Sequence, residues 1–293
     1  MKNIKFRTGL FLIVLMFSIL SMVGCTAQQV KSNKISDPQQ DLTLIVREDG
    51  NNGKQEFTLK ELAALPDSGF QHVYSTINNW PSSRFYAARG ITVRSILQAA
   101  GVLENAQMIT FRSSDSYEIS LTREQLLRKQ YYYPKVREGL ADLAEPVEPI
   151  IAYEYKEGSG DMGKAVLDAP CLIIGQSNPL EHTNPAFVVS VSEIIISTRE
   201  AEAWEPAGTF PAAGKIAPGE KVKLQHKDFG LVKLHYTLDG TNPTELSPMY
   251  NVSTYQPELN VPIPIADDTV IKVLVTGYGK KNSPISSFTF DVP

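Results

Sequence analysis

The stretch VYSTINNWPSSRFYAARGITVRSILQAAGV, Val73–Val102, decides the fold of this chain. Its last third has the pattern of a short amphipathic helix. Thr92 is suited to cap that helix, because a threonine side-chain oxygen accepts a hydrogen bond from a free N–H of the first turn. Gly101 is typical of the residue that ends a helix. Between them lies one apolar face, made of Val93, Ile96, Leu97 and Ala100.

Capping boxes predict two further short helices. Thr58 with Glu61 begins one, and Thr122 with Gln125 begins the other, because each pair can satisfy two backbone N–H groups reciprocally. Strand-like segments surround them at 41–46, 108–111, 117–121, 170–175 and 187–196. Strands mixed with short helices in this way favour an α+β domain over residues 41–198.

The C-terminal part has a different pattern. Residues 199–220 are rich in Ala, Pro, Gly and Glu, which is typical of a linker and the start of a second domain. Beyond them only strand signals occur, at 221–224, 232–238, 270–276 and 286–291, with a tight turn at 239–243. This pattern predicts a small all-β sandwich over residues 221–293.

The deciding stretch resembles the sulfite-oxidase-type molybdopterin domain. In that family a Cys-containing segment ends in Trp, and a Gly-x-x-Leu-x-x-Leu-Leu-x-x-Ala-Gly stretch follows. The flanking segments agree in order: FTLKELAALP at 57–66, SSDSYEISL at 113–121, APCLIIGQ at 169–176 and FVVSVSEIII at 187–196 resemble the family's early helix, Asp-Gly-Tyr strand, Pro-Leu-Arg-Leu strand and closing strand pair. The resemblance implies a mixed α/β fold over residues 41–198 and, in the enzymes, a molybdopterin cofactor.

The C-terminal part carries a second resemblance. HYTLDGTNPTELSPMY, His235–Tyr250, followed by DDTVIKVLVTGYGKKNSPISSFTF, is similar to the chitobiase/hexosaminidase C-terminal module. That module is a small immunoglobulin-like sandwich and an accessory of exported proteins. If it attaches the chain to a cell-wall glycan, Tyr236, Tyr250 and Tyr278 are the expected exposed aromatic residues. Carbohydrate binding is therefore one alternative function.

The N-terminus has the pattern of an export signal. A basic start precedes an apolar run over residues 10–23, shorter than the about 20 residues that a membrane-spanning helix needs. Met22-Val23-Gly24-Cys25 resembles the lipobox of bacterial lipoproteins, in which Leu usually stands in place of Met22. The resemblance implies a signal peptide at 1–24, acylation of Cys25, a flexible tether at 25–40 and attachment to the outer face of a membrane. The alternative is an ordinary secretory signal with an incidental cysteine.

The molybdenum ligand of the family is missing. In the enzymes a Cys thiolate binds the metal four residues before the Trp, and counting back from Trp80 gives Thr76, whose hydroxyl is not an anionic ligand at neutral pH. Cys171 lies in an apolar strand, where a thiol is typically a small hydrophobic group. In the enzymes, an Arg of the Pro-Leu-Arg-Leu strand holds the cofactor phosphate. In this chain Cys171 or Leu172 stands at that position. A single Arg7, without a twin-Arg pair, indicates export of an unfolded and empty chain. A molybdopterin-dependent oxidoreductase with an oxygen-ligated metal remains the catalytic alternative.

Composition excludes several other classes. With 28 basic and 32 acidic side chains and no basic stripe, a nucleic-acid partner is not expected. Two Cys and four His without a CxxC or HExxH spacing do not predict a zinc site.

The acidic stretch 145–161 is expected to be a solvated loop, with Ca²⁺ binding as the alternative. Tyr131-Tyr132-Tyr133 is expected to be a packing cluster.

On the enzyme fold, several residues would surround the former cofactor pocket. They are Thr76, Asn78, Trp80, Arg84, Tyr117, His182 and Asn184. Their side chains can offer hydrogen bonds and a stacking face to a small polar ligand, or simply fill the vacated space. The sequence thus predicts an extracytoplasmic, lipid-anchored protein that serves ligand binding or scaffolding, with no catalytic residue and no bound cofactor.

Overall fold

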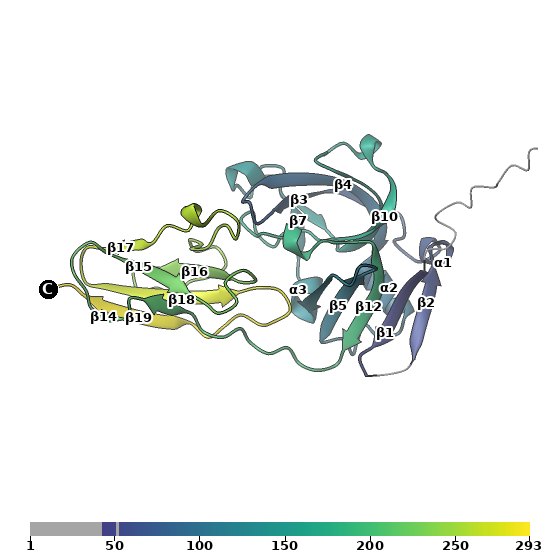
Figure 1. Ribbon diagram of the computed structural model, residues 1–293. Helices are drawn as coiled ribbons and strands as arrows, with labels where there is room; N and C mark the ends of the chain where they lie inside the picture. Colours follow the sequence, from purple (N-terminus) through teal and green to yellow (C-terminus); the bar gives the residue numbers. More distant parts are fainter. Residues whose placement is uncertain (1–42, 51–52) are drawn as a thin grey trace, which may run out of the picture. The chain divides into compact units, whose positions relative to one another are not determined.

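A computed structural model describes residues 43–50 and 53–293 of the chain (Figure 1). Cys25, the predicted signal peptide and the predicted tether therefore lie outside the described residues. Among the described residues, no helix is both long enough and apolar enough to cross a membrane. Their regular secondary structure is mostly β-strand, with few and short helices.

The first sheet has five strands in the order β2-β1-β12-β5-β6. Its strands are β1 (Thr43–Glu48), β2 (Lys54–Thr58), β5 (Met108–Ser113), β6 (Glu118–Thr122) and β12 (Val191–Ser197). β1 and β12 are parallel, with Ile45 opposite Glu193, and the other pairs are antiparallel. The predicted strands at 108–111 and 117–121 correspond to β5 and β6.

The second sheet also has five strands, in the order β11-β10-β9-β4-β3. Its strands are β3 (Phe70–Ile77), β4 (Ser83–Thr92), β9 (Ile150–Glu157), β10 (Val166–Ile173) and β11 (Val188–Val189). All neighbours are antiparallel. A two-stranded ribbon, β7 (Gln130–Tyr132) and β8 (Glu145–Val147), lies apart from both sheets in the pairing pattern.

The predicted closing strand at 187–196 is split between the two sheets. β11 pairs with β10 in the second sheet, whereas β12 pairs with β1 and β5 in the first. Ser190, between them, has a φ of 57°, in the left-handed region that breaks extended backbone. The break lets one continuous apolar segment serve both sheets.

The three predicted helix starts are confirmed. The Thr58 hydroxyl accepts a hydrogen bond from the Glu61 N–H at 3.2 Å, and the Glu61 carboxylate accepts one from the Thr58 N–H at 2.8 Å. Thr122 and Gln125 form the second capping box, at the start of α3, and the Thr92 hydroxyl caps α2. The helices are α1 (Leu59–Ala63), α2 (Val93–Ala99) and α3 (Arg123–Leu127), with 3₁₀ turns at η1 (Val136–Glu138), η2 (Met162–Lys164), η3 (Asn184–Ala186) and η4 (Pro257–Leu259).

The expectation of a solvated loop over residues 145–161 is wrong, because most of the segment is β8 and β9. Its apolar start, Ile150-Ile151-Ala152, is buried and overrides the acidic composition. The carboxylates that follow are paired across the sheet. Glu154 lies 3.0 Å from Arg89, and Glu157 lies 3.1 Å from Arg84.

One apolar core joins α2 to both large sheets. It includes Ile96 and Leu97 of α2, Phe111 and Ile194 of the first sheet, and Ile91, Ile151 and Leu172 of the second. A separate cluster on the other face of the second sheet contains Tyr74, Ala88, Ala152 and Cys171. The middle of the second sheet is therefore buried on both faces, which fits the apolar run in β10.

The C-terminal part is all-β, as predicted. One sheet contains β13 (Gly208–Phe210), β15 (Glu220–Gln225) and β17 (Ile263–Ile265), and the other contains β14 (Gly214–Lys215), β16 (Lys233–Thr237), β18 (Thr269–Thr276) and β19 (Ser286–Asp291). A core with Val222, Leu234, Val273 and Phe290 fills the sandwich. Residues 199–220, predicted as a linker and domain start, supply β13, β14 and the buried side chain of Trp204.

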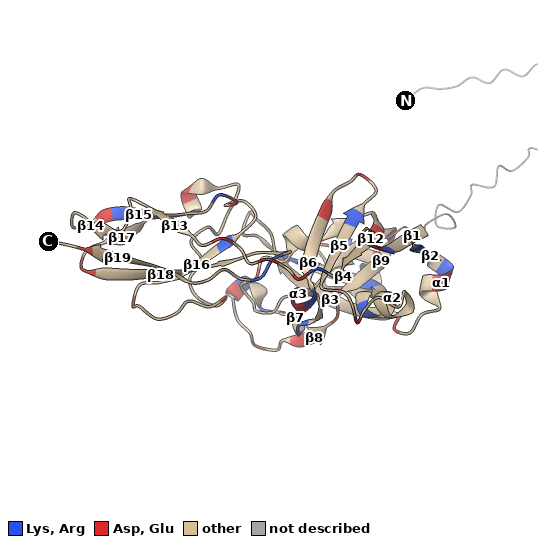
Figure 2. Ribbon diagram, turned by 90° about the horizontal axis from the view of Figure 1, so that it is seen from below, with Lys and Arg blue, Asp and Glu red and all other residues tan. Residues whose placement is uncertain are grey.

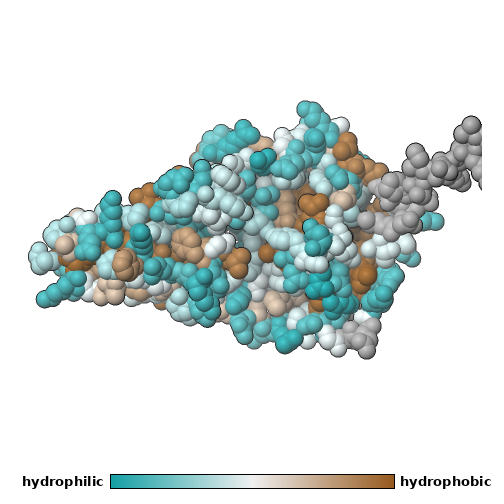
Figure 3. Space-filling model, viewed as in Figure 1, coloured by the Kyte–Doolittle hydropathy of each residue, from teal (hydrophilic) through white to brown (hydrophobic). Residues whose placement is uncertain are grey.

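Basic and acidic residues are interspersed along the ribbon (Figure 2). The Arg47 and Arg112 side chains, for example, both pair with the carboxylate of Glu193 between them. On the face drawn in Figure 3, apolar residues form separate patches within a mostly polar surface.

Candidate functional site

Thr76, which the sequence resemblance aligns with a metal-binding cysteine, is fully buried near the end of β3. Its hydroxyl oxygen accepts a 2.8 Å hydrogen bond from the hydroxyl of Thr183. The neighbouring Ser75 donates to Oε1 of Gln176 at 2.6 Å and accepts from the backbone N–H of Tyr133 at 2.8 Å. Side chains of this chain therefore fill the space beside Thr76 and satisfy its polar atoms.

These residues do not fit a molybdenum cofactor. A hydroxyl that already bonds another hydroxyl inside the protein offers no anionic ligand. Cys171, on β10, is 1% exposed, and burial raises the pKa of its thiol to about 12. The thiol is therefore protonated at neutral pH and is not a thiolate ligand.

The predicted residues of the β3–β4 turn face the surface. The Asn78 side-chain oxygen accepts hydrogen bonds from the N–H groups of Trp80 and Ser82, both at 2.9 Å, and so fixes the turn. Trp80 is 53% exposed and stacks on Tyr255, with ring centroids 5.3 Å apart and an interplanar angle of 11°. Arg84 pairs with Glu157, as described above.

Asn184 is the first residue of η3, and Tyr117 contacts the same turn. The half-exposed Tyr117 donates a hydrogen bond to the backbone oxygen of Pro185 at 3.1 Å, and partial burial raises its pKa. Asn184 donates to the hydroxyl of Tyr86 at 3.3 Å. The six predicted residues described so far thus make contacts at different places. Of these six, only Thr76 forms a hydrogen bond with the buried Thr183.

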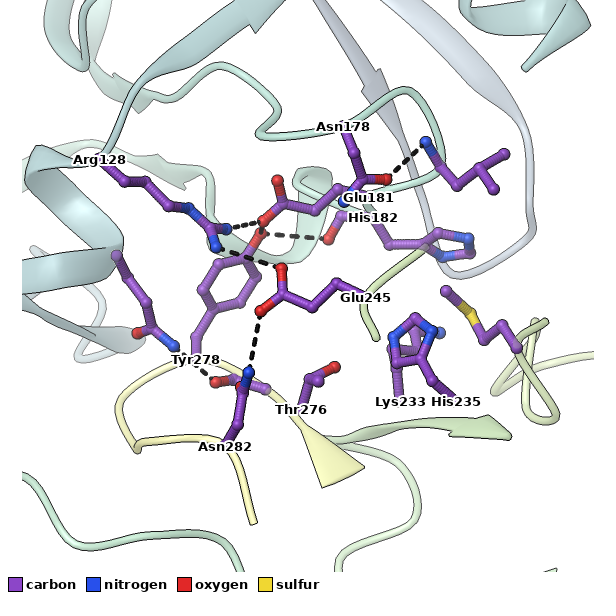
Figure 4. A pocket seen from close by; sticks show the side chains of 14 residues that line it. Arg128, Asn178, Glu181, His182, Lys233, His235, Glu245, Thr276, Tyr278 and Asn282 are labelled. Carbon is purple, nitrogen blue, oxygen red and sulfur yellow. Dashed lines mark hydrogen bonds and ion pairs between the residues drawn. The ribbon is translucent and has the colours of Figure 1, made fainter. Parts of the chain in front are cut away.

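The remaining predicted residue, His182, lines a pocket that the sequence did not predict (Figure 4). This pocket has a volume of about 60 Å³. The side chains labelled in Figure 4 are Arg128, Asn178, Glu181, His182, Lys233, His235, Glu245, Thr276, Tyr278 and Asn282. They come from the C-cap position of α3, the segment before η3, the strands β16 and β18, and the loops that follow these two strands. We refer to this pocket as the His182 pocket.

Arg128 organises the acidic side of the His182 pocket. Its guanidinium forms a short ion pair with Glu181 and lies 3.4 Å from a carboxylate oxygen of Glu245. Glu181 also accepts hydrogen bonds from the hydroxyls of Ser177 at 2.8 Å and Tyr278 at 3.2 Å. Both carboxylates of the pocket are thereby occupied by donors of the chain.

Nitrogen side chains form another part of the pocket. Burial lowers the pKa of Lys233 to about 8, and its Nζ donates to the backbone oxygen of Asn251 at 3.2 Å. Burial, together with the charges of Lys233 and His235, lowers the pKa of His182 to about 3. Burial also lowers the pKa of His235, whose Nδ1 lies 3.1 Å from the backbone oxygen of Ser247. Both imidazoles are therefore neutral at neutral pH.

The three tyrosines predicted as exposed glycan contacts are not exposed. Tyr250 is 6% exposed and lies in the sandwich core, against which the partly buried Tyr236 also packs. Tyr278 packs against the core of the large sheets and bonds Glu181. The aromatic residues of the C-terminal part that do reach the surface are Tyr255, at 61% exposure, and Phe210, at 62%.

The comparisons with known proteins bear mainly on the C-terminal sandwich. Residues 222–290 match the family described as Fn3 associated. No curated protein matches the sequence. Among solved structures, the chain is similar to the sulfane dehydrogenase SoxCD from Paracoccus pantotrophus, with a TM-score of 0.32 and 11% identity, over 84% of this chain and 69% of that one. Within the described residues, no group of three or more His, Cys, Asp or Glu side chains is arranged to hold a metal ion.

Proposed function

We propose that this chain is a lipid-anchored protein of the bacterial cell envelope that acts in ligand binding or scaffolding rather than catalysis. In this proposal, residues 41–198 are a degenerate sulfite-oxidase-type domain and residues 221–293 an accessory module of the chitobiase type. The observation that carries it is Thr76. Where the related enzymes present a thiolate to molybdenum, this chain has a buried hydroxyl that bonds Thr183.

Two further features support the proposal. Apart from Cys25, the sequence has one cysteine, Cys171, and burial holds the pKa of its thiol far above neutrality. The sequence between Lys2 and Cys25 resembles a Sec-type lipoprotein signal, which exports an unfolded chain without cofactor. Anchoring through Cys25 would keep the binding domains at the outer face of a membrane.

Metal and pterin analysis tests this proposal. We expect protein isolated from the membrane fraction of a host with active molybdenum-cofactor synthesis to contain far less than one molybdenum atom per chain. It should also give no pterin fluorescence after acid oxidation. A molybdenum enzyme of the sulfite-oxidase type, isolated in parallel, is the positive control. One molybdenum atom per chain would overturn the proposal and favour the oxygen-ligated oxidoreductase.

A second candidate function, binding of a cell-wall glycan, is favoured by the stacked pair Trp80–Tyr255. Exposed aromatic rings supply large, rigid contact surfaces for ligands. We expect Tyr255→Ala to weaken retention of the full chain on peptidoglycan or chitin by about tenfold, the scale of a central aromatic contact. Phe210→Ala is the matched control, since Phe210 is equally exposed, at 62%. Equal retention of both variants, or none of the unaltered chain, would reject this function.

A further inference from the structure

The His182 pocket contains buried nitrogen atoms that lack a hydrogen-bond partner. Among the described residues, three buried side-chain nitrogens have none: Arg128 Nε, His182 Nδ1 and Trp204 Nε1. Two of the three, on Arg128 and His182, belong to residues that line this pocket. His182 is 9% exposed, so bulk water does not compensate it. Unpaired buried polar atoms are rare in proteins and indicate an absent partner.

The charges in the pocket are also incompletely matched. In the part of the chain that the structure describes, no carboxylate lies within ion-pair distance of Lys233 Nζ. The two carboxylates nearby, on Glu181 and Glu245, are held by Arg128. Lys233 bonds only a neutral carbonyl at 3.2 Å. The pocket therefore combines an unpaired ammonium with an unpaired N–H donor on Arg128 Nε and with His182 Nδ1, which is a donor in one of the two neutral tautomers.

We propose that the His182 pocket binds a small oxyanion of the size of phosphate or sulfate, held by Lys233, His182 and Arg128 Nε. A cation is disfavoured because Lys233 would repel it and the carboxylates are already engaged. The volume of about 60 Å³ admits a small ion. It is far below the about 300–1,000 Å³ of pockets that hold drug-sized ligands. This inference deepens the proposed function, since it gives the ligand a chemical class.

Binding is expected to depend on pH through Lys233 and the other ionisable groups that line the pocket. These are His182, His235, Arg128, Glu181, Glu245 and Tyr278. Because burial lowers the pKa of Lys233 to about 8, the ammonium loses its proton at alkaline pH and the attraction to an anion is lost. The two histidines, whose pKa burial lowers, are neutral at neutral pH and contribute hydrogen bonds rather than charge. Affinity should therefore rise as the pH falls through about 8, the pKa of Lys233, and then level off.

Calorimetric titration of the full chain in detergent and chloride buffer tests the site. Sulfate is the main probe because its charge is constant over this range, and inorganic phosphate is the second. We expect sulfate to bind at about pH 6 and to lose more than about tenfold in affinity at about pH 9.5, where a group of pKa near 8 is neutral. Lys233→Met should weaken binding at about pH 6 by more than about tenfold. The exposed Lys221→Met on β15 should bind like the unaltered chain.

A second measurement covers the case in which Lys233→Met does not fold. The imidazole NMR signals of His182 and His235 in the unaltered chain should shift on addition of sulfate. The inference is overturned if neither anion produces heat or a shift, which would leave ordered water as the missing partner. It is also overturned if folded Lys233→Met binds sulfate as well as the unaltered chain. Molybdenum in the purified protein would instead overturn only the proposed function.

Discussion

Gly90→Ala is expected to destabilise the chain by about 3 kcal/mol, the upper range for forcing extra atoms into a packed interior. A Cβ at Gly90 would lie 2.2 Å from the carbonyl oxygen of Ile151 and 2.7 Å from Cα of Ala152. Both atoms belong to the backbone of β9, which cannot rotate away as a side chain can. The pairing of β4 with β9 also shifts register between Arg89 and Gly90, so this glycine occupies an irregularity where two strands approach closely.

Gly69→Ala is the matched control for this prediction. Nothing lies within 4 Å of the Cβ that Gly69 would gain, and its φ is not in the left-handed region. Its effect should stay within about 0.5 kcal/mol, or be slightly stabilising because the unfolded chain loses freedom. Guanidinium unfolding followed by circular dichroism measures both variants. Equal stability of Gly90→Ala and Gly69→Ala would show that β4 and β9 are not packed as described.

The helix starts were predictable because each depends on residues close in the chain. A capping box needs only a Thr and an acidic or amide residue three positions later, and Thr58 with Glu61 shows this pairing in the structure. Strand β9 was missed for the opposite reason. Its acidic residues indicated solvent, whereas their partners, such as Arg89 for Glu154, are supplied by a strand about 65 residues away in the sequence.

The same difference, between residues close in the chain and partners far apart in it, explains which residues of the candidate site the sequence could predict. Thr76 could be located by counting from Trp80, because a motif has fixed spacing. The His182 pocket could not, since Arg128 meets Glu245 across 117 residues of sequence. No spacing rule connects such segments, and each residue alone resembles an ordinary charged surface residue. Only the fold shows that their side chains converge.

Arg128→Met is expected to cost about 2 kcal/mol, between the cost for a surface pair and that for a fully buried one, because the side chains of Arg128 and Glu181 are 25% and 14% exposed. The variant keeps most of the apolar volume but leaves the carboxylates of Glu181 and Glu245 close together without a cation between them. Arg199→Met is the control, because Arg199 pairs with Asp49 at 2.9 Å but is 83% exposed. Its loss should stay below about 0.5 kcal/mol, since water solvates both charges.

The double variant Arg128→Met/Glu181→Gln separates the charge effect from lost packing. If the cost of Arg128→Met arises from an uncompensated buried carboxylate, neutralising Glu181 removes that cost, and the double variant should lose less than the sum of the single losses. Denaturant unfolding of the four proteins measures this coupling, which should be about 1 kcal/mol or more. Strict additivity would mean that water reaches Glu181 freely. The ion pair would then count for little, because a carboxylate that water solvates needs no cation beside it.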